Sequence, residues 1–393
     1  MMKKRPSLFL RILKWLAIVL FALVVLFFLV RFVGQRINAA TPKGGINEEM
    51  YVDINGSRQW INIYGQDLDN PVLLYLHGGP GSASSPISYA FTRKWADVYT
   101  VVTWDQRNCG KSYSEDQNST PLTYDLMMRD GEELTKFLLE YLHKDKITLL
   151  GHSWGTFYGC YLVLAYPEYY DCYIGTGQVL DFDKNEEAFQ EIARTWVDDE
   201  EGKNLYRTLT SQPGYNKEYY AARQALMEKY GYDMMAEGAD YNLLATQIFN
   251  PYYSLGDFYR FLKADSSVYD EFIASDEFRK FSLLGRTEYQ VPYYNINGEK
   301  DYQTNWLIAR EYFDEISAPR KELFIMKDRP ARVSGPEAYG LRHLAFAVPS
   351  VDDMVKELES KGVLCEPIRF DSYTGKPMTF FRDPDGLPIE IHE

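Results

Sequence analysis

Cysteine and net positive charge are both scarce in this sequence. Four cysteines occur in 393 residues, and none stands in a CxxC pair: Cys109, Cys160, Cys172 and Cys365. This spacing indicates neither a zinc site nor a disulfide framework, so we expect buried thiols. The 42 basic residues are outnumbered by 56 acidic ones, and the resulting formal charge of -14 repels phosphate backbones. We therefore expect no nucleic-acid partner.

One long apolar run stands near the N-terminus. The sixteen residues from Trp15 to Val30 would span roughly 24 Å as a helix, and Lys14 and Arg31 at its ends can extend their charges toward lipid headgroups. We expect a transmembrane anchor over residues 9–33. Basic residues are denser before the run than after it, which favours a single-pass protein with its N-terminus inside and the rest extracellular. A cleaved signal peptide, ending near residues 38–40, is the alternative.

The remainder of the chain alternates between strand-like and helix-like patterns, which predicts an α/β domain over residues 46–326. Strands are expected at residues 59–64, 71–76, 98–104, 147–150, 172–175, 291–296 and 322–326. Apolar residues repeat at helical spacing over residues 134–142, and His143 at the end of that helix is interpreted as a surface residue. From about residue 181 to 284 the chain becomes acidic, tyrosine-rich and helical in pattern. This segment predicts an inserted helical cap.

The strongest catalytic signal is the sequence GHSWG at residues 151–155. An apolar strand precedes it and a helix that begins around Thr156 follows it, so Ser153 occupies a tight strand-to-helix turn that exposes its hydroxyl. Glycines two residues to either side leave room for this turn. The pattern predicts Ser153 as a nucleophile. We do not expect His152 to be its base, because adjacent side chains on the turn point apart.

A glycine loop with the sequence HGGPG follows the strand at residues 71–76. Unhindered backbone N–H groups in such a loop can approach a developing oxyanion, and we expect Gly79 and Trp154 to supply the two donors. Taken alone, the loop could also be a plain glycine turn. A third block, residues 104–112, contains Asp105 and Arg107, which we expect to brace the loops by hydrogen bonds.

Together, HGGPG at 77–81, DQRNCGKS at 105–112 and GHSWG at 151–155 resemble the proline iminopeptidase branch of the α/β-hydrolases. The resemblance covers residues 48–326 and implies an eight-stranded, mostly parallel sheet with a helical cap and a Ser, Asp, His triad in that order. It assigns Ser153 as nucleophile, Gly79 and Trp154 as oxyanion donors, and Asp301 as the acid after the strand at 291–296. Epoxide hydrolases and dehalogenases carry an aspartate at the position of Ser153, so their chemistry is disfavoured.

The family's cap carboxylates hold the free amino group of the substrate. Six acids of the expected cap could do this, or could form a solvated helix face: Glu186, Glu187, Asp198, Asp199, Glu200 and Glu201.

The triad's base is missing from its expected place. The family pattern puts a histidine near Ala331, but no histidine occurs between His152 and His343. His343 lies at the start of an expected strand and is the less favoured substitute. Because the histidine takes the serine proton, its absence predicts impaired activity.

Residues 327–393 have a different character. We expect a strand at residues 341–348, a helix capped by Ser350 and three short strands, with a turn at residues 383–386. This βαβββ order and the closing sequence RDPDGLPIEIHE resemble one module of the vicinal-oxygen-chelate superfamily of glyoxalases and dioxygenases, over residues 322–393. The chain therefore resembles a junction of two families, which would be a natural fusion or a recombined or misassembled gene.

In that superfamily two modules form a cup around a divalent metal. The resemblance assigns Glu322, His343 and Glu390 as an incomplete ligand set, because the first module's histidine is absent. A divalent metal at the tail would need water in the open positions; otherwise His343 is simply a strand residue. No cofactor is expected for the hydrolase.

The sequence therefore predicts a membrane-anchored serine hydrolase that cleaves small N-terminal amide bonds of a peptide, or a related amide or ester, with activity lowered by the missing histidine. The alternatives are a surface binding protein without turnover and a metal-dependent glyoxalase- or dioxygenase-like activity of the tail.

Overall fold

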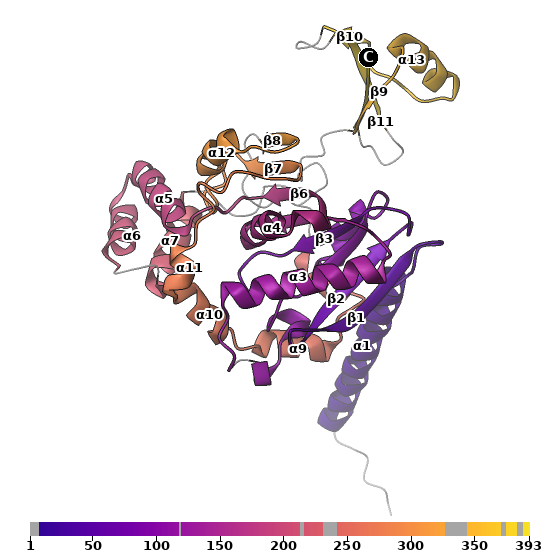
Figure 1. The fold of residues 1–393 in the computed structure, drawn as a ribbon. Coiled ribbons are helices and arrows are strands. Elements are labelled where there is room, and N and C mark those ends of the chain that lie inside the picture. The colour runs from indigo at the N-terminus through magenta and orange to yellow at the C-terminus, as the bar shows by residue number, and fades with distance from the viewer. Residues whose placement is uncertain are drawn as a thin grey trace, which may run out of the picture.

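The computed structural model describes residues 8–117, 119–212, 216–230, 242–326, 344–370, 375–382 and 388–393. Within these ranges the chain forms a long N-terminal helix, a large α/β domain and a small C-terminal α/β module (Figure 1).

The α/β domain is built on an eight-stranded sheet in the order β1-β2-β4-β3-β5-β6-β7-β8. Its strands are β1 (Ile46–Ile54), β2 (Ser57–Gly65), β3 (Val72–Leu76), β4 (Thr100–Trp104), β5 (Ile147–His152), β6 (Tyr170–Thr176), β7 (Tyr293–Gly298) and β8 (Lys321–Met326). Strand β2 is antiparallel to β1 and β4, and all other neighbours are parallel. The expected mostly parallel α/β sheet is confirmed.

The strands β3 and β4 are buried along their whole length, as is typical of parallel strands covered on both faces. All seven expected strands are present, with ends shifted by a few residues. Strand β1 was not expected, because its three consecutive polar residues, Asn47 to Glu49, interrupt the apolar alternation of an edge strand that is largely exposed. The hydrolase sheet therefore begins earlier in the chain than the pattern indicates.

Helices α2 (Tyr89–Thr92), α3 (Tyr124–Tyr141), α4 (Trp154–Ala165) and α12 (Trp306–Glu315) belong to the body of the domain. Helix α4 packs against β5 and β6, and α3 packs against α4. Helix α4 begins directly after Ser153, two residues earlier than expected. His143 lies exposed after α3, which confirms its interpretation as a surface residue. Cys109 and Cys160 are buried as expected, whereas Cys172 and Cys365 are half-exposed; all four are free thiols.

The described part of the chain between β6 and β7 is helical and forms the cap (Figure 1). Its helices are α5 (Phe182–Trp196), α6 (Glu200–Ser211), α7 (Lys217–Lys229), α8 (Leu243–Ile248), α9 (Leu255–Lys263), α10 (Ser267–Ala274) and α11 (Asp276–Lys280). Its two ends meet: Asp181 and Ser282 form a β-bridge, and the N–H of Leu283 donates to the Leu180 carbonyl at 2.9 Å. Helices α5, α6 and α7 share a small core of their own around Phe189, which is separate from the main core.

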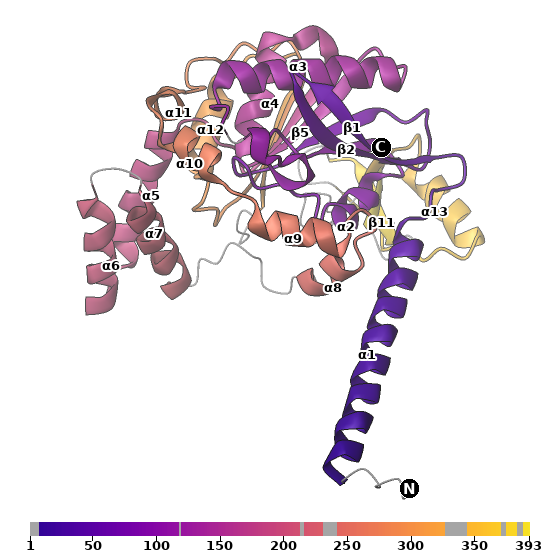
Figure 2. The same ribbon diagram turned by 90° about the horizontal axis from the view of Figure 1, so that it is seen from below.

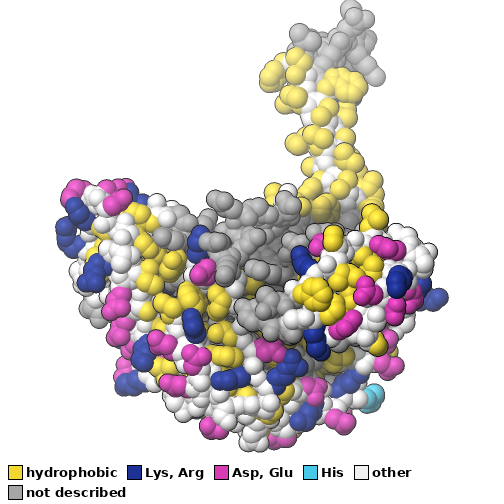
Figure 3. Space-filling model, turned by 90° about the horizontal axis from the view of Figure 1, so that it is seen from above, with side chains coloured by type: hydrophobic (Ala, Val, Ile, Leu, Met, Phe, Trp, Pro, Cys, Tyr) yellow, Lys and Arg dark blue, Asp and Glu magenta, His cyan; other side chains and the backbone are white. Residues whose placement is uncertain are grey.

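Helix α1 (Leu8–Asn38) extends away from the body (Figure 2). Residues 12–38 are long and apolar enough to cross a membrane, although a signal sequence passes the same test. Figure 3 shows this helix as a largely hydrophobic column leaving the domain. Its last turns contact the cap segment between α8 and α9, a contact that holds Arg31 at 5% exposure. Arg31 thus contacts protein instead of extending toward lipid headgroups as expected.

The C-terminal module follows β8 after residues 327–343, which lie outside the described residues. It consists of β9 (Leu344–Ala347), α13 (Val351–Ser360), β10 (Arg369–Phe370), β11 (Pro377–Arg382) and β12 (Pro388–His392). Its sheet order is β10-β11-β12-β9, with β12 and β9 parallel and the other pairs antiparallel. Ser350 caps α13 as expected, accepting from the Asp353 N–H at 3.2 Å. The expected turn at residues 383–386 lies outside the described residues.

Candidate active site

Ser153 stands between the end of β5 and the start of α4 in a backbone conformation that side chains rarely adopt, with φ 52° and ψ -121°. Close backbone packing surrounds it. A Cβ on Gly151 would lie 2.3 Å from the Gly155 carbonyl oxygen, and one on Gly155 would lie 2.1 Å from the Leu76 oxygen. Both positions therefore require glycine, and the turn presents Ser153 at the carboxyl end of the parallel strands.

The glycine loop after β3 lies against this serine. A Cβ on Gly78 would be 3.3 Å from the Cβ of Ser153. Gly79 has a φ of 127°, and a Cβ there would meet the backbone nitrogens of Gly81 and Ser82 at 2.6 Å. The loop can therefore approach Ser153 with bare backbone, which an oxyanion hole between Gly79 and Trp154 requires.

Asp301 follows β7 and is completely buried. Its carboxylate accepts from the Thr304 N–H at 2.7 Å, the Thr304 hydroxyl at 2.5 Å and the Gln303 N–H at 3.0 Å. Burial nevertheless raises its pKa to about 6, because the charged form loses its hydration. These bonds fix the carboxylate in one orientation.

Ser153 and Asp301 both flank the end of β6. The Ser153 N–H donates to the Thr176 carbonyl at 2.9 Å, and a Cβ on the next residue, Gly177, would lie 3.4 Å from Asp301 Oδ2. The structure therefore brings the predicted nucleophile, the glycine loop and the predicted acid to one edge of the sheet.

Two described histidines near Ser153 support the loops around it. His77 is fully buried, with Nδ1 donating to the Gly78 carbonyl at 2.7 Å and Nε2 accepting from the Gln106 N–H at 3.2 Å. Burial lowers the pKa of His77 to about 4, so it stays neutral at physiological pH. His152 Nδ1 lies 3.0 Å from the Thr176 hydroxyl. His343 and residue 331, where the family pattern puts the base, lie outside the described residues.

The cap contacts the acid loop through an ion pair that the sequence did not reveal. Arg223 Nε donates to Glu186 Oε2 at 3.0 Å, and Tyr219 donates to the same oxygen at 2.8 Å. The other nitrogens of Arg223 donate to Gln303 Oε1 at 2.5 Å and to the Tyr302 carbonyl at 2.9 Å. Glu186, one of the six cap acids, thus holds a buried arginine beside the loop of Asp301.

The other acids of that set lie toward the outside of the cap. Asp199 caps α6 and pairs with Lys229 at 2.7 Å, and Glu201 pairs with the same lysine. Glu200 pairs with Lys203 on an exposed face. This arrangement favours the solvated helix face over a set of acids gathered to hold an amino group.

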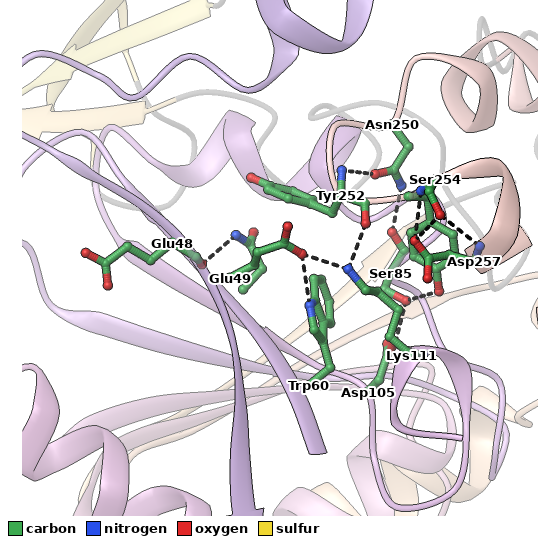
Figure 4. Close-up of polar contacts among 12 residues, drawn as sticks. Glu48, Glu49, Trp60, Ser85, Asp105, Lys111, Asn250, Tyr252, Ser254 and Asp257 are labelled. Atoms are coloured by element: carbon green, nitrogen blue, oxygen red, sulfur yellow. Dashed lines mark hydrogen bonds and ion pairs between the residues drawn. The ribbon is translucent and has the colours of Figure 1, made fainter. Parts of the chain in front are cut away.

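A second polar network joins the cap to the glycine loop (Figure 4). Asp105 is buried and accepts from the Ser85 hydroxyl at 2.5 Å and the Lys111 N–H at 2.8 Å, while burial raises its pKa to about 6. Ser85 Oγ lies 2.7 Å from the Tyr253 hydroxyl, and Asn250 donates to the Ser85 carbonyl at 2.8 Å. The cap segment between α8 and α9 is therefore bonded to the loop that carries Gly79.

Arg107 and Asp105 brace the loops, as expected. Arg107 forms a two-pronged ion pair with Asp130, with both nitrogen–oxygen distances at 2.7 Å. Its Nη2 also donates to the carbonyls of Ile54, the last residue of β1, and of Asn55. Lys111 Nζ donates to Glu49 and to the Tyr252 carbonyl at 2.7 Å, as drawn in Figure 4.

The three residues of the incomplete metal set belong to different parts of the chain. Glu322 lies in β8 of the hydrolase sheet and accepts from Arg320 Nε at 2.9 Å. Glu390 lies in β12 of the C-terminal module, opposite Phe380. His343 is outside the described residues, and within those residues no group of three or more His, Cys, Asp or Glu could hold a metal ion.

The eight-stranded sheet, the strained turn at Ser153 and the buried Asp301 together have the arrangement of an α/β-hydrolase. The chain belongs to the alpha/beta hydrolase fold family, because the model of that family matches residues 71–328. Residues 300–391 match the Glyoxalase/Bleomycin resistance protein/Dioxygenase superfamily. The two matches overlap over residues 300–328, which contain α12 and β8, and the structure places β8 in the hydrolase sheet.

Several known proteins resemble the hydrolase part. A probable aminopeptidase of Bacillus subtilis, YbaC, is 26% identical over 284 residues, which is 70% of this chain and 87% of that protein. Proline iminopeptidase of Lactobacillus delbrueckii subsp. lactis is 32% identical over 108 residues, 27% of this chain and 35% of the enzyme. The crystal structure of the Mycobacterium smegmatis proline iminopeptidase has a TM-score of 0.54 and 21% identity, and covers 72% of this chain and 91% of its own.

The tail has relatives of its own. The uncharacterized protein YwkD of Bacillus subtilis is 58% identical over 72 residues. That match covers 18% of this chain and only 56% of the relative, so the chain spans just over half the length of this protein.

Proposed function

We propose that this chain is a serine hydrolase that cleaves N-terminal amide bonds of small peptides, with Ser153 as the nucleophile. The observation that carries the proposal is the strained turn of Ser153, at φ 52°, directly beside the glycine loop of residues 77–81. Strain of this kind is retained where surrounding structure enforces it, commonly at catalytic residues. The relatives named as aminopeptidases supply the substrate class.

In the proposed reaction Ser153 Oγ attacks the carbonyl carbon of the scissile amide. The negative charge that develops on the carbonyl oxygen is stabilised by the N–H groups of Gly79 and Trp154. Asp301 is the acid that orients a histidine base and stabilises its charged form. The amine leaves with the proton that Ser153 lost to the base, and water then hydrolyses the acyl-enzyme ester and restores the serine hydroxyl.

The base determines how fast this reaction runs. The family pattern puts the histidine near Ala331, where this chain has none, and His343 is the next histidine along the chain. Without a positioned base the serine hydroxyl stays a weak nucleophile, and residual catalysis comes from the oxyanion hole and substrate binding. We therefore propose turnover orders of magnitude slower than in a relative with an intact triad.

A fluorophosphonate probe on the purified full-length chain tests the nucleophile and the base together. We expect slow labelling that Ser153→Ala abolishes and that Ser119→Ala, at an exposed serine, leaves unchanged. Release of a chromophore from a prolyl anilide should follow the same pattern. Labelling of Ser153→Ala at the wild-type rate would refute the assignment of the nucleophile. Rapid labelling that His343→Ala removes would instead identify His343 as the base.

We further propose that α1 anchors the protein as a single-pass membrane helix, with the catalytic domain outside the cell. The support is the apolar helix of residues 12–38. Only 6% of its most apolar stretch is buried inside the protein. Flotation of the full chain with phosphatidylcholine vesicles tests the anchor, and protease accessibility of the hydrolase domain in intact cells tests its side. A mature protein that begins after residue 40 would establish the cleaved signal instead.

Two other functions compete with this proposal. The missing histidine also fits a surface protein that binds a peptide without turnover, and ligand-induced thermal stabilisation without product would identify it. The tail could bind a divalent metal through His343 and Glu390, with Glu322 as the third candidate. Metal analysis of the purified wild-type chain and of the His343→Ala variant tests this function. A metal site that uses His343 would give a bound ion in the wild type and none in the variant.

A further inference from the structure

The C-terminal end of α1 is fixed to the cap by side chains that donate to backbone carbonyls. Arg31 donates through Nη1 to Ile248 and through Nη2 to Tyr253, both at 2.6 Å. Gln35, one turn later, donates to the Asn250 carbonyl at 2.7 Å, and Asn38 donates to the Phe249 carbonyl at 3.0 Å. Three successive turns of the helix therefore contact one cap segment, residues 248–253.

The packing at this contact is close. A Cβ on Gly34 would lie 2.3 Å from the ring of Phe249, so the helix backbone meets the aromatic side chain directly. Arg31 is almost fully buried here although most of α1 is exposed. This is a built interface, and it sets the direction of α1 relative to α8 and α9.

The same contact indicates how close the cap lies to the bilayer that α1 would cross. Residues 15–30 carry no charge, and Arg31 is the first charged residue after them. A span of about 20 residues crosses the hydrocarbon of a bilayer, so Arg31 marks the level at which α1 leaves it. Because Arg31 is bonded to Ile248, the last residue of α8, that helix lies at the membrane boundary.

Large apolar side chains are exposed at this level. On α8, Leu243 and Leu244 are 45% and 67% exposed. On α9, Leu255, Tyr259 and Leu262 are spaced at i, i+4 and i+7 and so share one face; they are 47%, 65% and 78% exposed.

Helix α9 is thus apolar on two sides. Phe258 and Phe261 point inward and pack on Tyr253. Their ring centroids lie 4.8 and 6.5 Å, respectively, from the ring centroid of Tyr253. Helix α9 lies on the side of the body from which α1 departs in Figures 1 and 2, and Figure 2 shows α8 on that side as well. Burial inside the protein explains the inner residues but not the outer ones.

We propose that this outer face, made of Leu243, Leu244, Leu255, Tyr259 and Leu262, lies in the surface of the same bilayer that α1 spans. The inference rests on the proposed anchoring of α1. A lipid surface is the occupant that the geometry favours, because the anchor is bonded to the adjacent segment and brings the face to the bilayer without any further partner. Tyrosine is typical of the membrane interface, and Lys263, in the last turn of α9, can reach headgroup phosphates.

Depth-dependent fluorescence quenching on the full chain tests the proposal. Cys172 and Cys365 are changed to serine, and Leu262→Cys carries an environment-sensitive fluorophore. The matched control is Leu307→Cys on α12, a leucine that is 44% exposed and lies on the part of the body away from α1 (Figure 1). The vesicles are phosphatidylcholine with a nitroxide near the top of the acyl chain in one preparation and near its end in another.

We expect strong quenching at residue 262 by the shallow nitroxide, weaker quenching by the deep one, and neither at residue 307, as insertion by roughly 5–10 Å requires. Leu255→Glu added to the labelled chain should reduce the quenching at 262. Vesicle-bound protein with equal quenching at 262 and 307 would overturn the proposal while leaving the anchor intact. Protein that does not float with the vesicles would refute the anchor and the membrane face together. Concentration-dependent quenching between labelled copies, without nitroxide, would show a second copy of the chain as the occupant instead.

Discussion

Arg223 and Glu186 form an ion pair inside the cap, with 3.0 Å between Nε and Oε2 and side-chain exposures of 3% and 4%. The guanidinium continues to Gln303 and Tyr302, the residues that follow Asp301. A pair this deeply buried is costly to desolvate, so its retention suggests a specific task. Its position indicates that it holds the acid loop against the cap.

Breaking this pair from one side should be strongly destabilising. Arg223→Met leaves Glu186 as an uncompensated buried carboxylate, and we expect a loss of about 3–5 kcal/mol in the free energy of unfolding. The double variant Glu186→Gln with Arg223→Met should recover part of that loss. Lys203→Met, which removes an exposed pair with Glu200, should change stability by less than about 0.5 kcal/mol. Denaturant unfolding in detergent measures all three, and equal effects of Arg223→Met and Lys203→Met would contradict the role of burial.

The buried carboxyl of Asp301 should make stability fall as pH rises. Its pKa is about 6 in the folded protein and near 3.8 in the unfolded chain, so the folded state binds more protons between these values. Well below pH 3.8 the group is protonated in both states and costs nothing. As pH rises through 6 it must ionise in a buried site, which costs at most about 3 kcal/mol.

Comparing Asp301→Asn with the wild type isolates this contribution from other titrating groups. Between pH 4 and pH 7, the unfolding free energy of Asp301→Asn should rise relative to that of the wild type. A difference that stays constant over this range would show that the buried carboxyl does not titrate there. Asp105→Asn should behave similarly, since burial raises the Asp105 pKa to about 6 as well.

Gly155→Ala should disrupt the nucleophile turn. The added Cβ would meet the Leu76 carbonyl oxygen at 2.1 Å, and backbone cannot move aside as a side chain can. We expect a loss of about 3 kcal/mol, at the upper end for overpacking, together with loss of Ser153 labelling. Gly256→Ala in α9 is the matched control: only Ser254 Oγ lies within 4 Å, at 3.5 Å, so a gain of up to about 1 kcal/mol is expected. A Gly155→Ala protein as stable as Gly256→Ala would show that the turn can relax.

The contact between anchor and cap should control local motion of the cap. Arg31→Leu removes two charge-assisted hydrogen bonds to Ile248 and Tyr253 while leaving α1 apolar. We expect amide hydrogen exchange in residues 248–253 to speed up on the order of tenfold or more. Arg36→Leu, at an exposed position of the same helix, should leave exchange unchanged. Similar exchange in both variants would mean that Arg31 does not hold the segment.

The parts of this site that could be predicted from the sequence are carried by short, contiguous motifs. The five residues of GHSWG are enough to predict a strained turn at Ser153. Asp301, in contrast, was assigned through the family resemblance, which places the acid after the strand expected at residues 291–296. Strand β1 escaped prediction because Glu48 and Glu49 are tolerated on a largely exposed edge strand.

The missed interactions join residues that are far apart in the chain. Arg31 reads as the flank of an apolar run, yet its partners lie 217 and 222 residues away. Glu186 sits in an acidic stretch like its neighbours, and only its contact with Arg223, 37 residues on, distinguishes it. Periodicity reports which face of a helix is apolar, but it contains no information about which backbone carbonyl a charged side chain will find.

Leu180 and Leu283 are hydrogen-bonded neighbours, so the chain leaves the sheet for the cap and returns to it at a single point. An insertion with this geometry can be lengthened, shortened or exchanged in evolution without changing the order or register of the strands. The cap of this protein also holds the end of α1, through residues 248–253. A lineage that altered the cap could therefore change its contacts with the Asp301 loop and its attachment to α1 in one genetic event, while Ser153 and Asp301 stayed where they are.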